Sequence, residues 1–260
     1  MNPRRRALAI LCLSDPVAKA AQARALFADL DDRTIDPAER LDAPGELPGR
    51  PPLPRLLHAK EIPSRTPFTL EGRAAMLHAV THIEFNAINL ALDAVWRFAG
   101  MPLAYYRDWL RVASEEALHF TLLREHLNAL GFDYGDFDAH DGLWAMAQRT
   151  ALDATARMAL VPRTLEARGL DAAPPMQAKL RRAGDLRAVE ILDVILRDEV
   201  GHVAIGNHWY RWLCARDRLD PVALYAELTL RYEAPRLRPP FNHAARLAAG
   251  FTDAEIALLT

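Results

Sequence analysis

Residues 116–119 read Glu-Ala-Leu-His, and residues 199–202 read Glu-Val-Gly-His. In both stretches a glutamate precedes a histidine by three residues. Positions three apart share one face of a helix, so each copy directs a carboxylate and an imidazole to one point. One copy is common by chance, but two copies in one chain indicate a paired site.

The first copy lies in a segment that predicts a helical hairpin. Thr69 is a candidate N-cap, and the apolar periodicity that follows it predicts helices over 70–98 and 103–130. Residues 100–102, Gly-Met-Pro, break the pattern between the two helices, and Gly131 ends the second one.

The second copy lies in a less regular segment. The pattern predicts a helix over 143–168 that ends at Gly169, a short helix over 174–183 and a long helix over 185–215. Pro162 lies inside the first of these helices, where the missing N–H predicts a kink.

Two further glutamates lie on the helices that precede the two copies. Glu84 stands among apolar residues of its helix face, where a buried lone carboxylate is costly unless it is paired or binds a metal. For Glu166 an alternative partner is Arg163, three residues earlier. The interval from Glu84 to Glu116 is 32 residues and that from Glu166 to Glu199 is 33, as if one helix pair were used twice.

This spacing predicts that the carboxylates meet. Gly100 lies 16 residues from each of Glu84 and Glu116, roughly 24 Å along either helix, so an antiparallel hairpin sets the two glutamates side by side. Four carboxylates neutralise two divalent ions, and oxygen-rich ligands with one nitrogen per metal suit iron or manganese. The set matches the ligands of ferritin-like di-iron and di-manganese bundles. The predicted metal ligands are Glu84, Glu116, His119, Glu166, Glu199 and His202.

Two acidic residues are expected to support the ligand histidines. A metal-bound imidazole usually donates its other ring N–H to a carboxylate, which fixes the ring orientation. Asp198 immediately precedes Glu199 and is rotated about 100° from it around the helix, so it faces a neighbouring helix. We predict that Asp198 accepts the N–H of His119. Glu115, equally placed in the first copy, is the symmetric candidate for His202.

The fold class that follows is all-α, with a ferritin-like four-helix bundle at its centre. Residues 17–30 predict an N-terminal helix, and seven prolines within 41–67 predict an extended arm. Asp220 and Pro221 begin a further helix that runs to about Glu233. The expected segments are an N-terminal helix and arm packed on the bundle (1–68), the bundle (69–216) and a helical extension (217–260).

The composition is that of an ordinary globular protein, with 51% hydrophobic and 25% charged residues among 260. The formal net charge is −2, so no global positive field attracts nucleic acid or an anionic membrane. No apolar stretch reaches the ~20 residues needed to span a bilayer. Neither nucleic acid nor a membrane is therefore an expected partner, and self-association into a homo-oligomer is left open.

The cysteines and the N-terminus bear on location. Cys12 and Cys214 lie far apart in the sequence and favour a reducing compartment. Residues 4–13, three arginines and then an apolar run, imitate the start of a secretory signal peptide. Asp15 and Pro16 look like the start of a helix instead, so a cytoplasmic location is expected.

Several longer stretches resemble a bacterial family of ferritin-like proteins of unknown function. The resemblance covers most of the chain and implies a ferritin-like fold and a di-metal site, but no reaction comes with it. The stretches that carry it are His82-Ile83-Glu84, Tyr106-Arg107-Asp108-Trp109-Leu110, Glu115 to Phe120, Val161 to Gly169 and Arg197 to Val203.

The expected function is that of an oxidoreductase that activates dioxygen or peroxide at two metal ions, iron and/or manganese, with a small-molecule substrate or oxidant as its partner. The ligand set does not identify the substrate or a catalytic residue. Iron storage or detoxification without substrate turnover is the alternative, although the arm and the C-terminal helices exceed what a minimal storage cage requires. A bundle that has lost its metals is disfavoured because all six expected ligands are present.

Overall fold

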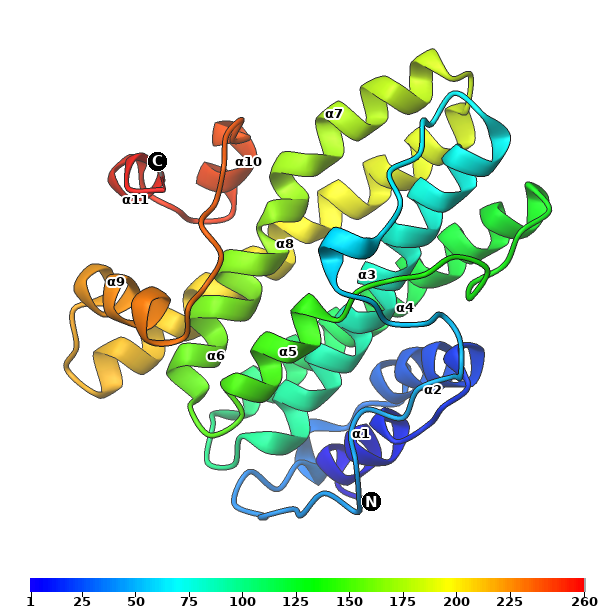
Figure 1. Cartoon of the computed structure of the whole chain (residues 1–260). Helices are drawn as coiled ribbons and strands as arrows, with labels where there is room; N and C mark the ends of the chain where they lie inside the picture. Colours follow the sequence, from blue (N-terminus) through cyan, green and yellow to red (C-terminus); the bar gives the residue numbers. More distant parts are fainter. Residues whose placement is uncertain (260) are drawn as a thin grey trace. The chain divides into compact units, whose positions relative to one another are not determined.

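Helices make up the regular structure of this chain (Figure 1). The computed structural model describes residues 1–259. Within that range the β-type pairing is limited to an isolated bridge between Leu56 and Ala139. The all-α prediction is therefore confirmed.

The internal contacts of the chain define two compact units. Unit 1 comprises residues 1–141, and unit 2 begins at residue 142. The division into 1–68, 69–216 and 217–260 stays a prediction.

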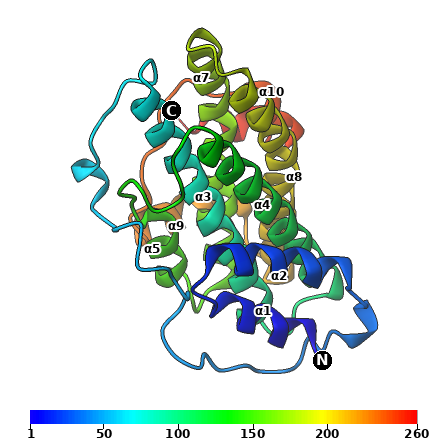
Figure 2. The same cartoon turned by 90° about the vertical axis from the view of Figure 1, so that its right-hand side faces the viewer.

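A hairpin of two long helices forms the centre of unit 1 (Figures 1 and 2). Helix α3 (Leu70–Arg97) packs along α4 (Leu103–Ala129), as the sequence predicts. The hydroxyl of Thr69 accepts a hydrogen bond from the Gly72 N–H at 3.1 Å and so caps α3. Gly100 turns the chain between the helices with φ +78°, a conformation that favours glycine.

The N-terminal arginine run belongs to a helix of unit 1. Helices α1 (Pro3–Leu11) and α2 (Pro16–Ala28) lie side by side in Figures 1 and 2. The guanidinium of Arg4 is fully buried and donates to the carbonyls of Val95 (3.1 Å) and Trp96 (2.8 Å). These carbonyls lie in the last turn of α3, which has no N–H groups of its own to offer them. The predicted helix over 17–30 is confirmed, whereas α1 was not predicted.

The Pro-rich segment is an extended arm, as predicted, interrupted by the short 3₁₀ turn η2 (Ala59–Glu61), and a similar turn, η1 (Asp32–Thr34), precedes it. Two arginines of the arm form ion pairs with the loop that ends unit 1. Arg50 pairs with Asp141 and Arg55 with Asp138, both at 2.8 Å. These pairs hold the arm against unit 1.

Unit 2 departs from the predicted helix over 143–168. That segment is divided into two short helices followed by a π-helical turn. Proline has no N–H to donate, but its carbonyl can accept the hydrogen bond that closes such a turn. The Ala167 N–H donates to the Pro162 carbonyl, five residues back, at 3.1 Å. The elements are α5 (Gly142–Arg149), α6 (Ala154–Leu160) and the π-turn η3 (Val161–Glu166).

The next two predictions for unit 2 also need correction. Gly169 does not end a helix, and Pro174 and Pro175 lie inside α7 (Arg168–Arg182). Pro174 cannot donate to the Leu170 carbonyl four residues back. The side-chain amide of Asn242 donates to that carbonyl instead, at 3.2 Å, and so α7 continues through the prolines.

The remaining helices of unit 2 combine confirmed and unpredicted elements. Helices α8 (Leu186–Arg216) and α9 (Pro221–Arg231) confirm the predictions over 185–215 and 221–233. Helices α10 (His243–Ala248) and α11 (Asp253–Ala257) lie in the segment predicted as a helical extension, although their bounds were not predicted. The start of α11 has a sequence signature, because Thr252 and Glu255 form a capping box.

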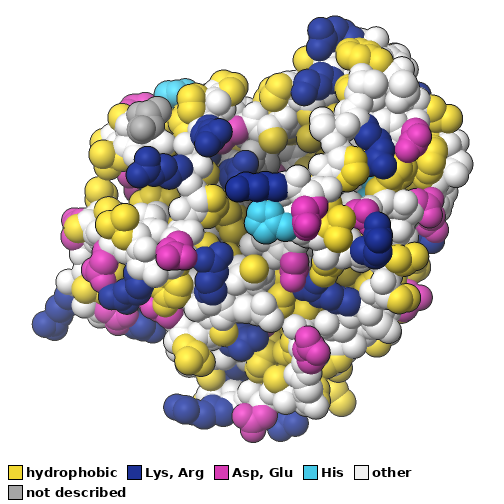
Figure 3. All heavy atoms as spheres, viewed as in Figure 1, with side chains coloured by type: hydrophobic (Ala, Val, Ile, Leu, Met, Phe, Trp, Pro, Cys, Tyr) yellow, Lys and Arg dark blue, Asp and Glu magenta, His cyan; other side chains and the backbone are white. Residues whose placement is uncertain are grey.

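On the face drawn in Figure 3, Lys and Arg side chains lie among Asp and Glu side chains. None of the helices within residues 1–259 is both long and apolar enough to cross a bilayer.

Candidate metal centre

Unit 1 brings together three of the predicted ligands. Glu84 lies on α3, and Glu116 and His119 lie on α4, so the hairpin sets them side by side. The Nδ1 atom of His119 lies 3.1 Å from Oε2 of Glu84 and 3.3 Å from Oε2 of Glu116. All three side chains are buried, and their ligand atoms lie within 4.8 Å of one another. The group can hold a metal ion.

The electrostatics of this cluster favour a cation. Burial, followed by the negative charge of Glu116, raises the pKa of Glu84 to about 8. Two carboxylates that share a dry site cannot both ionise without a compensating positive charge. A divalent ion supplies that charge and accepts both carboxylates and the imidazole as ligands. The residues present therefore fit a metal ion.

Unit 2 repeats the glutamate–histidine pair. Glu199 and His202 are buried on α8, and the His202 Nδ1 lies 3.3 Å from the Glu199 Oε2. This distance equals that between His119 and Glu116. The two sequence copies thus give the same local geometry.

Glu166 is the last residue of the π-turn and is half-buried. Gly169 lies three residues later, and a Cβ atom there would stand 3.6 Å from the Cγ of Glu199. Positions three apart share a face, so Glu166 stands on the side of this segment that approaches Glu199.

Arg163, the alternative partner of Glu166, is used elsewhere. Its guanidinium donates to Oε1 of Glu255 at 2.7 Å and to Oδ1 of Asn207. The structure thus gives Arg163 partners other than Glu166, and the role of Glu166 as a metal ligand stays a prediction. The sequence analysis missed Glu255, although its capping-box position was a readable signal.

The two supporting acids stay predictions. Asp198 is half-buried and accepts hydrogen bonds from its neighbour Arg197 at 2.8 and 3.1 Å. Glu115 is also half-buried. The contact of Asp198 with His119, and that of Glu115 with His202, would join residues of different units, and the structure does not test them.

His78 and His82 belong to a separate buried cluster of unit 1. The Nδ1 of His82 lies 2.8 Å from the Tyr134 hydroxyl, and the Nε2 of His78 accepts the Gly135 N–H at 2.9 Å. The His78 and Tyr134 rings stack at 5.4 Å. Burial lowers the pKa of His78 to about 4.

This shift predicts acid sensitivity. The unfolded chain binds a proton at His78 as the pH falls below 6.5 and the folded chain only near pH 4, so the stabilisation present above pH 6.5 is lost progressively as the pH falls from 6.5 to 4. The loss amounts to about 3 kcal/mol. His78→Gln keeps an acceptor for the Gly135 N–H but does not titrate. Urea unfolding at pH 7 and pH 4.5 should show a smaller loss in the variant, and equal losses would contradict the prediction.

Comparisons with known proteins place this chain in a family. Residues 12–257 match the family model described as "Protein of unknown function (DUF455)". A relative from Haemophilus influenzae, described as "Uncharacterized protein", is 54% identical over 213 residues, which cover 79% of this chain and 74% of the relative. No solved structure matches the chain. A match over nearly the whole length, together with this identity, means that the chain is a member of the DUF455 family.

Proposed function

We propose that this protein is an oxidoreductase that activates dioxygen or peroxide at two metal ions, iron and/or manganese. The observation that carries the proposal is the buried cluster of Glu84, Glu116 and His119, in which two acidic groups and one imidazole share one point. Burying two carboxylates together costs free energy in the metal-free protein. A divalent ion between them offsets that cost.

The proposal assigns three protein ligands to each metal. Unit 1 supplies two glutamates and one histidine, and unit 2 supplies the same chemistry. A ferritin-like four-helix bundle, as the sequence predicts, would join the two sets into one centre, and that joining is part of the proposal. The two sets are Glu84, Glu116 and His119 in unit 1, and Glu166, Glu199 and His202 in unit 2.

The protein residues have definite tasks in this scheme. When bound, the metal ions supply the redox chemistry and sites for an oxidant. Burial beside Glu116 favours the protonated form of Glu84 in the metal-free protein, and Glu84 would release this proton on metal binding, because the cation supplies the compensating charge. Apolar neighbours of these ligands, such as Ala87, Ile88 and Ala117, are buried and keep water away.

Exposure of the iron-loaded protein to oxygen tests the proposal. Anaerobic protein titrated with Fe(II) and then mixed with oxygen should develop visible absorbance that saturates at about two irons per chain. The compact ligand sets limit the oxidised iron to the bound ions. Stopped-flow absorption spectroscopy with total iron analysis measures both quantities.

The storage alternative gives a different result in the same experiment. Continued oxidation of many irons per chain, with a mineral core visible by electron microscopy, would favour storage. No absorbance change at any iron ratio would refute both functions.

A further inference from the structure

The end of the chain docks on the π-turn that carries Glu166. We name residues 242–257 the strap; it contains helices α10 and α11. Its apolar side chains join a buried cluster with residues that follow the π-turn. The cluster comprises Ala167, Leu170, Val203, Ala249, Phe251 and Ile256.

One anchor of the strap is a buried ion pair. The fully buried Arg246 donates to both carboxylate oxygens of Asp171, at 3.0 and 2.6 Å. The backbone N–H of Asn242 donates to the same carboxylate at 2.8 Å. The first end of the strap is thereby fixed to α7.

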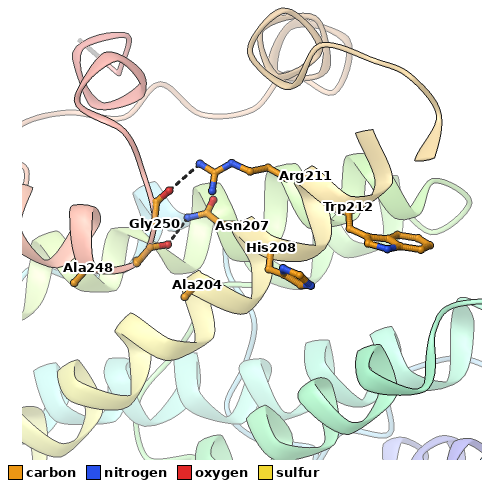
Figure 4. A pocket seen from close by; sticks show the side chains of 8 residues that line it. Ala204, Asn207, His208, Arg211, Trp212, Ala248 and Gly250 are labelled. Atoms are coloured by element: carbon orange, nitrogen blue, oxygen red, sulfur yellow. Dashed lines mark hydrogen bonds between the residues drawn. The ribbon is translucent and has the colours of Figure 1, made fainter. Parts of the chain in front are cut away.

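A second anchor runs from α8 to the backbone of the strap, beside the pocket in Figure 4. Asn207 donates to the Ala249 carbonyl and Arg211 to the Gly250 carbonyl, both at 2.8 Å. These contacts fix the turn between α10 and α11. Glu255 lies in the first turn of α11, directly after this connection, so its position relative to α8 is fixed as well.

Glu255 receives two guanidinium groups. Its Oε1 accepts from Arg163 at 2.7 Å, and its Oε2 accepts from Arg211 at 2.9 Å. Burial alone would raise the pKa of Glu255, but the Thr252 N–H and the two arginines lower it below its ordinary value. Arg163 also lies over the Phe251 ring, 4.6 Å from its centroid. The strap thus holds the Arg163 guanidinium from two sides.

The strap contacts the same segment that carries the ligand. Arg163, Ala167 and Leu170 contact the strap. Glu166 and Gly169 lie between them in the chain, and a Cβ atom at Gly169 would stand 3.6 Å from the Cγ of Glu199. The guanidinium of Arg163 donates to Glu255 and Asn207, although Glu166 is only three residues away.

We infer that Glu255 is a positioning residue that keeps Arg163 away from the metal ligand Glu166. Without Glu255, a buried guanidinium loses its carboxylate partner and takes the carboxylate three residues along the chain. That ion pair competes with a divalent ion for Glu166. The inference rests on the proposed function, since it assumes that Glu166 binds metal.

Mn(II) binding by the full-length protein tests the inference. Free Mn(II) is measured by its electron paramagnetic resonance signal during titration. Glu255→Gln keeps the size of the side chain but removes its charge. We expect one Mn(II) to bind with the wild-type dissociation constant. The dissociation constant of the other should rise by a factor of about 10 or more. Adding Arg163→Met to this variant should restore the lost affinity, because the competing charge is gone.

Asp253→Asn is the matched control. It removes an exposed carboxylate from the same helix α11 and leaves Glu255 and Arg163 paired, so both Mn(II) affinities should stay unchanged. Wild-type affinities in Glu255→Gln, or no recovery in the double variant, would overturn the inference and leave the proposed function intact. Failure of the wild type to bind Mn(II) or Fe(II) would overturn the proposed function itself, and the inference with it.

Discussion

Glu116→Gln will lower the metal content of the protein from about two ions per chain to about one or fewer. The substitution preserves the shape of the side chain and removes the charge that Glu84 and His119 cannot replace. Protein expressed with added iron or manganese and analysed by inductively coupled plasma spectrometry gives the stoichiometry. Glu125→Ala, an exposed acid on the same helix, should leave the content unchanged.

Glu116→Gln should also change how strongly metal stabilises the folded protein. Without metal, Glu116→Gln should be at least as stable as the wild type, because it removes one of two acidic groups buried together. With metal, the wild type should gain stability through binding and the variant should gain much less. Thermal unfolding with and without Mn(II) measures both. A variant that is strongly destabilised without metal would show that Glu116 has a structural role instead.

Gly206→Ala will lower the free energy of unfolding by about 1–3 kcal/mol, as overpacking does. A Cβ atom at this position would lie 2.5 Å from the Cβ and 2.7 Å from the Cγ of Pro162. The proline ring cannot rotate away, so α8 and the π-turn must separate. Urea unfolding monitored by circular dichroism measures the change.

Gly201→Ala on the same helix provides the control with the opposite sign. A Cβ atom there meets nothing within 4 Å among the described residues. Alanine should therefore stabilise α8 by about 0.5–1 kcal/mol, because it restricts the unfolded chain more than glycine does. Equal effects of the two substitutions would refute the close contact between Gly206 and Pro162.

The hairpin in unit 1 was predictable because its information is local. Thr69, Gly100 and Gly131 mark helix ends by capping and turn chemistry that acts within a few residues. The 16 residues on each side of Gly100 then fix how Glu84 and Glu116 meet. The all-α class and the place of three ligands follow from such short-range rules.

Unit 2 was less predictable because distant residues override its local signals. Pro174 and Pro175 predict a helix start, but Asn242, some seventy residues later, satisfies the carbonyl that Pro174 leaves without a donor. Pro162 predicts a kink, and its packing against Gly206 accompanies a π-turn instead. No local pattern contains either contact.

The sequence by itself determined the helix class, the long helices and the repeated glutamate–histidine pairs, since periodicity and caps depend on neighbours in the chain. Only the tertiary structure decided the partners of the buried charges. Arg163 could pair with Glu166 by spacing, yet it pairs with Glu255, 92 residues away. Arg4 likewise donates to the carbonyls of Val95 and Trp96, which lie more than ninety residues away in the sequence. A buried charge takes the partner that folding brings within hydrogen-bond distance, and sequence spacing does not encode that distance.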